Sequence, residues 1–464
     1  MYPEASSVAH HEAEPVTAQS LNTEVLGRLI GAGAQLRPWL LVTGALLAVG
    51  LVGLVLRIAG GFEPAKWSYV ASVYAYLMTV AQSAPIVAVA LRLVKADWRR
   101  PATRVAELFT AVGLLNVILV IPLLIAMPST EGRLNIWMDW TVLGGGVPFI
   151  TVGNLLAQLL LTFTGLALLW ASAIPDMSAA LPQTSGARRI WYARLAGDWL
   201  GSTNQWIIQR AALGVLGALY FIFYVSTQTL LTIDFSMSMI PGWWSAIYPA
   251  QLSLVGLQSG LSATLIALYV HRRVGGLGRH LRVDQFWGLA KLLLALSLFW
   301  FYFWWSEFIT VWYGRAPREQ NLLLLVMFGP YFIPFVLAFL ASFVVPWLSL
   351  IWNPVRKSIL GPTLVAVSVL IGCYFNTIRL FVAPWALDEH NVLHLEHVPA
   401  TPHFPDVIDL LIVPGFLAGA IFCYLLATRL VPTLNLWEMK EGLLLRVPRP
   451  FMRSHETTVI AKPQ

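Results

Sequence analysis

Ten long apolar stretches constrain the fold of this chain more than any other feature of its sequence. A helix that crosses a bilayer needs roughly 20 mostly apolar residues in a row. The composition agrees, because 58% of the 464 residues are hydrophobic, only 11% are charged, and the mean hydropathy is +0.70. The stretches lie near residues 38–60, 67–94, 105–127, 147–174, 207–230, 248–270, 286–312, 322–352, 359–383 and 407–432.

The stretches predict an all-α fold, a polytopic integral membrane bundle of about ten transmembrane helices. In lipid only helices and closed barrels satisfy their own backbone groups, and these runs are too long for barrel strands. We expect a transmembrane domain over 37–432 between polar cytoplasmic tails at 1–36 and 433–464. The first residues lack the basic region of a signal peptide, and nothing indicates a separate soluble domain.

The basic residues predict the orientation. If both termini lie on one side, 24 of the 30 Lys and Arg residues fall on that side, which the positive-inside rule makes cytoplasmic. We therefore expect a multi-pass protein of the bacterial inner (cytoplasmic) membrane. Topology and anionic lipid explain the net charge of +7, so no nucleic-acid partner is expected.

Four ionisable residues lie within or at the edge of apolar runs: Arg57, Asp234, Glu307 and Arg379. A charge at the bilayer centre costs roughly 2.5–3.5 kcal/mol on insertion scales, so each invites a functional interpretation. Glu307, in "FWFYFWWSEFITVWYG", could hold a proton, or it could pair with an arginine of a neighbouring helix. The two arginines lie near outer span ends, where snorkelling to the interface is expected.

Several kinds of site are disfavoured. The two cysteines, Cys373 and Cys423, fall inside predicted spans and cannot ligate an iron–sulfur cluster, and we expect all nine histidines in tails or loops, which disfavours haem. The external loop "APWALDEHNVLHLEHVPATPHFPD" places His390, His394 and His397 on one face if it is helical. Zinc could bind there, but a proline-rich loop is more typical of a docking surface.

Four segments together resemble a known family. They are "TIDFSMSMIPGWWSAIYP" (Asp234, Pro241, Gly242, Trp243, Ser245, Ile247), "KADWRRPATRVAELFTAVG" (Trp98, Arg99, Arg104, Ala106, Glu107), "FWWSEFITVWYG" (Glu307, Phe308, Trp312, Tyr313, Gly314) and the closing "VIDLLIVPGFLAGAIFCYLLATRLVPTLNLWEMKE". In this order they resemble the NrfD/PsrC family of quinone-interacting membrane subunits, especially the ten-helix subunit of alternative complex III.

The resemblance implies two four-helix bundles plus extra helices that bind menaquinone or ubiquinone near the outer face. The chain itself would carry no haem and no iron–sulfur cluster. Electrons would pass between the quinone and a periplasmic ferredoxin-like iron–sulfur subunit, in a complex with further membrane and cytochrome or molybdopterin-type subunits. Oxidation of a quinol releases two protons, so proton acceptors beside its hydroxyls are a chemical need.

The sequence departs from the family pattern at two expected histidines. Gln82 stands at the second-span position, and Trp244 follows Pro-Gly-Trp. Glutamine can hydrogen-bond a quinone carbonyl but cannot take its proton, whereas imidazole titrates near neutrality. The leading interpretation assigns proton transfer to Asp234 and Glu307. The predicted pocket lining is Gln82, Trp243, Trp244 and Tyr248.

Two other functions stay open. A redox-silent membrane anchor of the same kind of complex, with or without a proton path, predicts aromatic side chains between Gln82 and Asp234. A secondary transporter is disfavoured, because the two halves lack a matched pair of Gly/Pro-broken helices, the usual pointer to a substrate site.

Overall fold

The computed structural model describes residues 25–27, 33–128, 149–388, 394–451 and 455–460. Ten helices of this described part are long and apolar enough to cross a membrane. They confirm the prediction of an all-α, multi-pass helical bundle. The ten are Leu36–Ala59, Pro64–Leu93, Thr103–Ala126, Ile150–Gln183, Thr203–Met239, Tyr248–Arg273, Val283–Gly314, Phe332–Leu350, Leu360–Trp385 and Asp409–Leu430.

The helices form two groups of four spans and one extra pair. In the first group α7 packs on α6 and α9, and α3 packs on α6; in the second, α10 packs on α11 and α16. The first group comprises α3 (Ser68–Ala81) with α4 (Ala84–Leu93), α5 (Thr103–Glu107) with α6 (Gly113–Ala126), α7 (Phe149–Ala180) and α9 (Thr203–Phe235). The second comprises α10 (Tyr248–Arg273), α11 (Val283–Gly314), α13 (Phe332–Phe339) with α14 (Val345–Leu350), and α16 (Leu360–Thr377).

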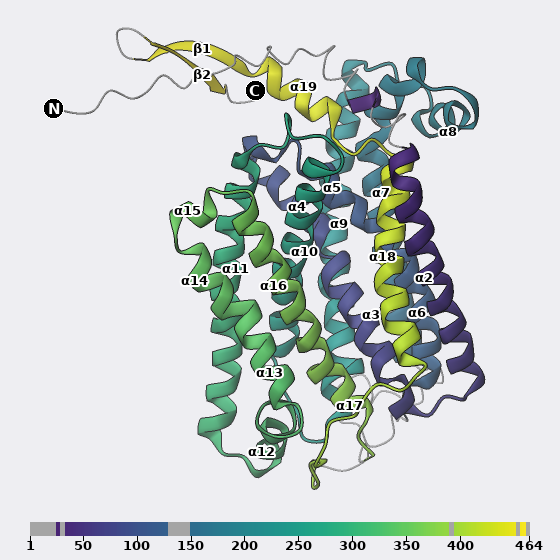
Figure 1. Cartoon of the computed structure of the whole chain (residues 1–464), viewed down its shortest axis with the longest axis vertical. Helices are drawn as coiled ribbons and strands as arrows, with labels where there is room; N and C mark the ends of the chain where they lie inside the picture. Colours follow the sequence, from purple (N-terminus) through teal and green to yellow (C-terminus); the bar gives the residue numbers. More distant parts are fainter. Residues whose placement is uncertain (1–24, 28–32, 129–148, 389–393, 452–454, 461–464) are drawn as a thin grey trace, which may run out of the picture.

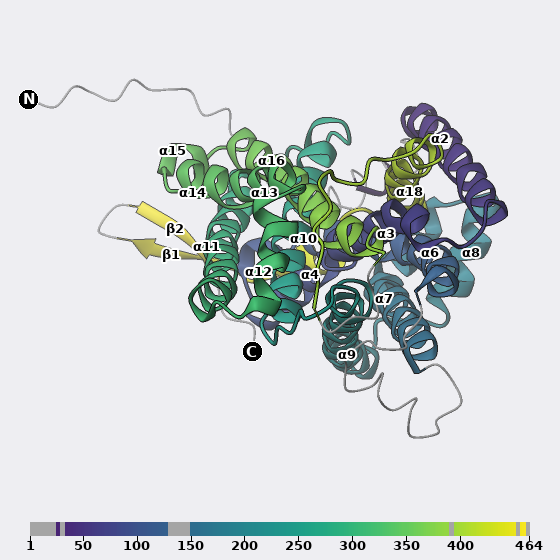
Figure 2. The same ribbon diagram turned by 90° about the horizontal axis from the view of Figure 1, so that it is seen from below.

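The extra pair, α2 (Gly33–Ala59) and α18 (Asp409–Leu430), packs along the first group (Figures 1 and 2). Two glycines let these helices approach closely. A Cβ on Gly415 would lie 2.4 Å from the Cα of Gly50, so only glycine fits there. At the α12 end of the bundle, where α2 ends and α18 begins, the Arg57 guanidinium bonds Asp406 and Asp409.

The remaining elements distinguish the two ends of the bundle in Figure 1. We call one the α19 end; it carries α8 (Gly186–Ala196), α15 (Asn353–Arg356), α19 (Leu436–Leu444) and the antiparallel hairpin β1 (Arg446–Phe451) with β2 (His455–Ile460). The opposite end, the α12 end, carries α12 (Pro317–Leu323) and α17 (Ala383–Trp385). The predicted polar tail after residue 432 therefore contains a helix and a hairpin that hydropathy did not indicate.

Two spans are interrupted where the sequence predicted continuous helices. The second span turns at Gln82 and Ser83, and α4 restarts with Pro85 in its first turn. The predicted stretch 322–352 breaks at Gly329 and Pro330, because proline cannot donate the next helical hydrogen bond. The apolar run therefore contains a short helix followed by a span.

Single turns of wider π-helix occur in the second group. They are η7 (Leu324–Phe328), η8 (Leu340–Val344) and η9 (Ile378–Val382). Short tighter turns also occur, at η1 (Pro64–Trp67), η2 (Asp97–Arg99), η3 (Leu108–Val112), η5 (Leu181–Gln183) and η6 (Met237–Met239). Isolated π turns are frequent at functional sites. Two of them, η7 and η9, flank the cavity described next.

Candidate functional site

A small cavity at the α12 end of the second group collects four of the residues singled out from the sequence. Trp243, Tyr248, Glu307 and Arg379 all line it, and we call it the Glu307 cavity. Its volume is about 20 Å³, enough for about one water molecule. The other lining residues are Gln251, Trp304, Phe308, Val311, Leu322, Leu323, Val326, Met327 and Leu380.

A tight turn before α10 places the first two of these residues. Gly242 has a positive φ of 81°, and the amide of Trp243 donates to the carbonyl of Ile240 at 3.2 Å. Proline followed by a residue with positive φ is the pattern of a type II turn, which explains Pro-Gly at this point. The ring of Trp243 then packs on Tyr248, with centroids 4.4 Å apart. The turn therefore fixes an aromatic wall of the cavity.

Glu307 reaches the cavity from α11. Its carboxyl lies close to the hydroxyl of Ser245 and the indole of Trp243. No ion pair joins it to Arg379 in the described part of the chain, although both residues line the cavity. The arrangement differs from a locked salt bridge, because carboxyl and guanidinium both face a small space.

Arg379 comes from the π turn η9 and is only 2% exposed. Its Nε donates to Asn376 at 3.0 Å, and its guanidinium lies 5.4 Å from the centroid of the Phe335 ring. Its Nη1 finds no hydrogen-bond partner among the described residues. The prediction that Arg379 snorkels to the interface is therefore wrong: a buried guanidinium with spare donor capacity lines the cavity.

Asp234 lies elsewhere, inside the first group. It is fully buried near the end of α9, and Asn154 of α7 donates to its carboxylate at 2.6 Å. The Glu307 cavity does not include it. The structure therefore separates the two carboxylates that the sequence placed in one acid–base set.

A column of buried polar side chains along α7 continues from Asp234. Gln158, one turn beyond Asn154, accepts from Tyr74 at 3.1 Å and donates to Thr162 at 3.1 Å. From Asn154 to Thr162 the column covers about 12 Å of helix. These side chains are tightly packed, and the rings of Tyr74 and Phe235 lie 5.9 Å apart.

Gln82 lies at the far end of this column. Tyr220 donates to its carbonyl oxygen at 2.6 Å and contacts its Oε1 at 3.1 Å. Its side-chain nitrogen has no partner among the described residues, and a Cβ on Gly113 would touch both that nitrogen and Thr162. Gln82 is thus held inside the first group and does not line the Glu307 cavity.

Trp244 was also predicted to line the pocket. Its side chain is 57% exposed and does not line the cavity. The turn that directs Trp243 inward leaves its neighbour at the surface.

Arg57 is also buried, so the prediction that it snorkels is wrong. Its guanidinium donates to Asp406 at 2.6 and 2.8 Å and to Asp409 at 2.7 Å. Burial disfavours the charged form of Asp406, but the bonds and charge of Arg57 outweigh it and hold the pKa of Asp406 below its ordinary value. These bonds fix the start of α18 against α2.

The histidine loop gives no metal site among the described residues: no group of three His, Cys, Asp or Glu side chains is suitably placed there. His394 and His397 are described, whereas His390 lies outside the described residues. The zinc hypothesis for the complete set of three histidines stays a prediction.

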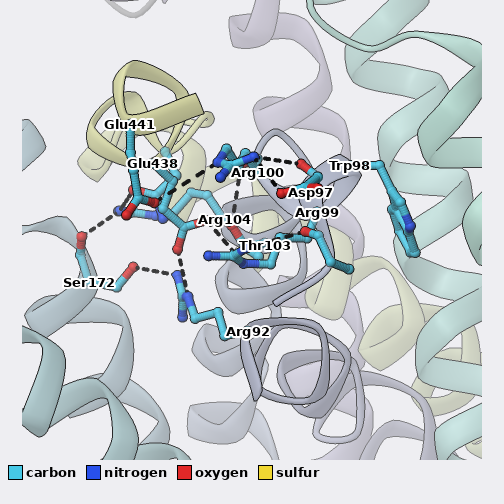
Figure 3. A network of polar contacts seen from close by, with 12 residues as sticks. Arg92, Asp97, Trp98, Arg99, Arg100, Thr103, Arg104, Ser172, Glu438 and Glu441 are labelled. Atoms are coloured by element: carbon cyan, nitrogen blue, oxygen red, sulfur yellow. Dashed lines mark hydrogen bonds and ion pairs between the residues drawn. The ribbon is translucent and has the colours of Figure 1, made fainter. Parts of the chain in front are cut away.

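A charged network at the α19 end joins the segment "KADWRRPATRVAELFTAVG" (residues 95–113) to α19 (Figure 3). Arg92 bonds Glu107 and donates to Glu438 at 2.7 Å, and Arg104 donates to Asp176 at 2.9 Å. Figure 3 shows Trp98 pointing away from this network, toward α11. The sequence motif is thus part of an attachment between the bundle and α19.

Sequence reasoning missed several of these polar residues. Asp176, Asn154 and Gln158 lie in one long apolar helix, α7, and are almost fully buried. The carboxylate of Asp176 was detectable as one more charge near the end of an apolar run. The two amides were not, because an uncharged polar residue barely lowers the hydropathy of a span. No known family model and no curated protein sequence matches this chain.

Proposed function

We propose that the chain is a quinone- or quinol-binding membrane subunit of a multi-subunit respiratory oxidoreductase. It would lie in the bacterial inner membrane with both termini in the cytoplasm and exchange electrons with a periplasmic iron–sulfur subunit. The observation that carries the proposal is the meeting of Glu307, Arg379, Trp243 and Tyr248 around one cavity. By the positive-inside rule this cavity faces the outer side of the membrane.

The lining offers an acceptor for the first of the two protons that quinol oxidation releases, and the two electrons would pass to the iron–sulfur subunit. Glu307 takes a proton from a quinol hydroxyl, and the spare N–H of Arg379 donates to the oxygen that becomes negative. The indoles of Trp243 and Trp304 supply flat apolar surface for the ring. These roles require no cofactor within this chain.

A quinone ring is larger than a cavity of about 20 Å³, so the proposal includes an opening of the site. Part of the cavity wall is formed by Leu322 and Leu323 of α12 and by Val326 and Met327 of η7. Together α12 and η7 form one short helix, which ends at the Gly329–Pro330 break and is separate from the long spans. We infer that its outward movement admits the ring.

Quinol turnover by the intact complex tests the proposal. Glu307→Gln keeps the size of the side chain but removes the proton acceptor, so turnover should fall on the order of a hundredfold or more. Glu63→Gln is the matched control, since the side chain of Glu63 is 61% exposed, pairs with Lys66 and does not line the cavity. Unchanged turnover in Glu307→Gln would contradict the site.

Copurification tests the proposed partner: a ferredoxin-like iron–sulfur protein should purify together with this chain.

A redox-silent anchor is the second candidate, and the packing of the first group favours it. Buried side chains including Tyr74 and Gln158 occupy the region between Asp234 and Gln82. This candidate predicts a complex that assembles with the chain, contains no quinone bound to it, and turns over equally well with Glu307→Gln.

A further inference from the structure

One segment of the loop that precedes α18 holds the short helix formed by α12 and η7. We call this segment, residues 395–403, the strap; it lies beside α12 (Figure 2). Asn321 of α12 donates to the strap's backbone, to the carbonyl oxygens of Leu395 at 2.7 Å and Glu396 at 3.4 Å. The side chain of Leu395 is only 1% exposed and belongs to the same apolar cluster as Leu322 of α12. Hydrogen bonds and a shared apolar cluster therefore join the strap to α12.

The strap also contacts the break that ends the short helix. A Cβ on Gly329 would lie 3.9 Å from Cγ1 of Val398, so this part of the strap packs beside the break. The backbone N–H of His403 donates to the hydroxyl of Tyr331 at 3.2 Å. Tyr331 follows Pro330 directly and is only 3% exposed. The strap is therefore bonded on both sides of the break.

The far end of the strap is fixed to the long spans. Tyr69 of α3 donates to the carbonyl oxygen of His403 at 2.9 Å, and the two rings lie 6.2 Å apart. Three residues further along the chain, Asp406 accepts two bonds from Arg57 of α2. The strap thus ties the short helix to α3 and α2.

The short helix itself has a break at each end. Before it, Arg315 ends α11 with a positive φ of 47°, and after it come Gly329 and Pro330. A left-handed residue and a proline both interrupt helical hydrogen bonding, and hinges are commonly a few residues at the ends of an element. The short helix can therefore tilt as a unit when the strap releases it.

We propose that the strap regulates access to the Glu307 cavity by holding the short helix closed. While the strap keeps its bonds with Asn321 and Tyr331, the apolar side chains of α12 and η7 form part of the cavity wall. When these bonds break, the short helix tilts outward and the cavity opens to a ring-sized ligand. The identity of that ligand rests on the proposed function, whereas the opening can be measured without any quinone.

Reactivity of a thiol in the cavity wall tests the strap in the full-length protein. Met327 lines the cavity and is 6% exposed, so in Met327→Cys the new thiol should react slowly with N-ethylmaleimide. Adding Asn321→Leu and Tyr331→Phe removes the side-chain groups that bond the strap, and the reaction should become about tenfold faster. Peptide mass spectrometry distinguishes this thiol from Cys373 and Cys423.

Gln320→Leu is the matched control, because the Gln320 amide lies on the same helix but donates to the carbonyl oxygen of Arg315 and not to the strap. Hydrogen exchange of the same variants shows whether the rest of the fold is kept: it should rise in α12 and η7 and stay unchanged in α11 and α16. Equal thiol reactivity in Asn321→Leu/Tyr331→Phe and in Gln320→Leu would overturn the proposal, as would unchanged exchange in α12.

The KM for quinol separates this proposal from the proposed function. A larger open population raises the apparent affinity for a ligand that binds the open state, so Asn321→Leu/Tyr331→Phe should lower the KM of the intact complex. Faster thiol reaction with an unchanged KM would support the strap and contradict quinol entry into the Glu307 cavity.

Discussion

Two carboxylates near the α12 end, Glu307 and Asp234, have different surroundings. Glu307 faces a cavity that also contains the guanidinium of Arg379. Asp234 is enclosed and bonded by the amide of Asn154 at 2.6 Å. A proton acceptor must reach the proton that it takes, so the geometry favours Glu307 for this role.

The isosteric change Asp234→Asn should therefore alter quinol turnover less than twofold. An asparagine oxygen can still accept the bond from Asn154, so the fold is kept. Asp234→Ala, in contrast, leaves that buried amide without this partner and should cost about 1–3 kcal/mol of stability. Turnover of the intact complex and thermal unfolding measure the two effects. A loss of turnover in Asp234→Asn as large as that in Glu307→Gln would contradict the assignment.

At the residue scale, the sequence singled out several of the residues that line the Glu307 cavity. A charge inside an apolar run is rare enough to mark Glu307 and Arg379, and the Pro-Gly-Trp segment marked Trp243. The sequence did not place Trp244 at the surface, because the direction of adjacent side chains depends on a turn with positive φ at Gly242. Nor did it separate Asp234 from Glu307, since that depends on which helices pack together.

Helix packing depends on glycine where α2 and α18 meet. A Cβ on Gly415 would lie 2.4 Å from the Cα of Gly50 and 2.8 Å from its nitrogen, contacts that real Cβ atoms do not make. The clash is with backbone, so no side-chain rotation relieves it.

We expect Gly415→Ala to destabilise the protein by about 1–3 kcal/mol, the usual cost of overpacking. Thermal unfolding in detergent or nanodiscs measures the change. Gly214→Ala is the matched control, because a Cβ on Gly214 of α9 meets nothing within 4 Å. Equal unfolding temperatures for the two variants would show that α2 and α18 are farther apart than described.

At the element scale, hydropathy predicted the ten spans well, because in lipid a long apolar run has almost no alternative to a helix. It missed the break at Gly329 and Pro330, since a window of about 19 residues averages over two residues. It also missed the π turns, including η9 with Arg379, because the choice between α and π hydrogen bonding depends on neighbouring helices.

The C-terminal part of the chain is joined to the bundle by buried charges. Glu438 of α19 is fully buried and accepts from Arg92 at 2.7 Å and from Thr103 at 3.0 Å. Breaking a buried ion pair leaves a charge uncompensated, which typically costs 3–5 kcal/mol. This network links the last helix to the first group of spans, as Figure 3 shows.

Glu438→Gln should therefore increase hydrogen exchange in α19 strongly. Glu441→Gln is the matched control: its side chain is 23% exposed, bonds Arg210, which is 61% exposed, and reaches Arg100 only at 4.0 Å, so its loss should cost under about 1 kcal/mol. Hydrogen exchange followed by mass spectrometry compares the two. Equal protection of α19 in both variants would mean that apolar contacts, not Glu438, hold this helix.

At the scale of the whole molecule, the proposed function depends on one site. Labelling by a photoreactive quinone analogue, followed by peptide mapping of the intact complex, tests it most directly. Quinone binding in the Glu307 cavity predicts label on the segments carrying Trp243 and Glu307. Excess natural quinone should remove this label, and Glu307→Gln should reduce it. Competed label confined to the segments around Gln82 and Asp234, or no competed label on this chain, would contradict it.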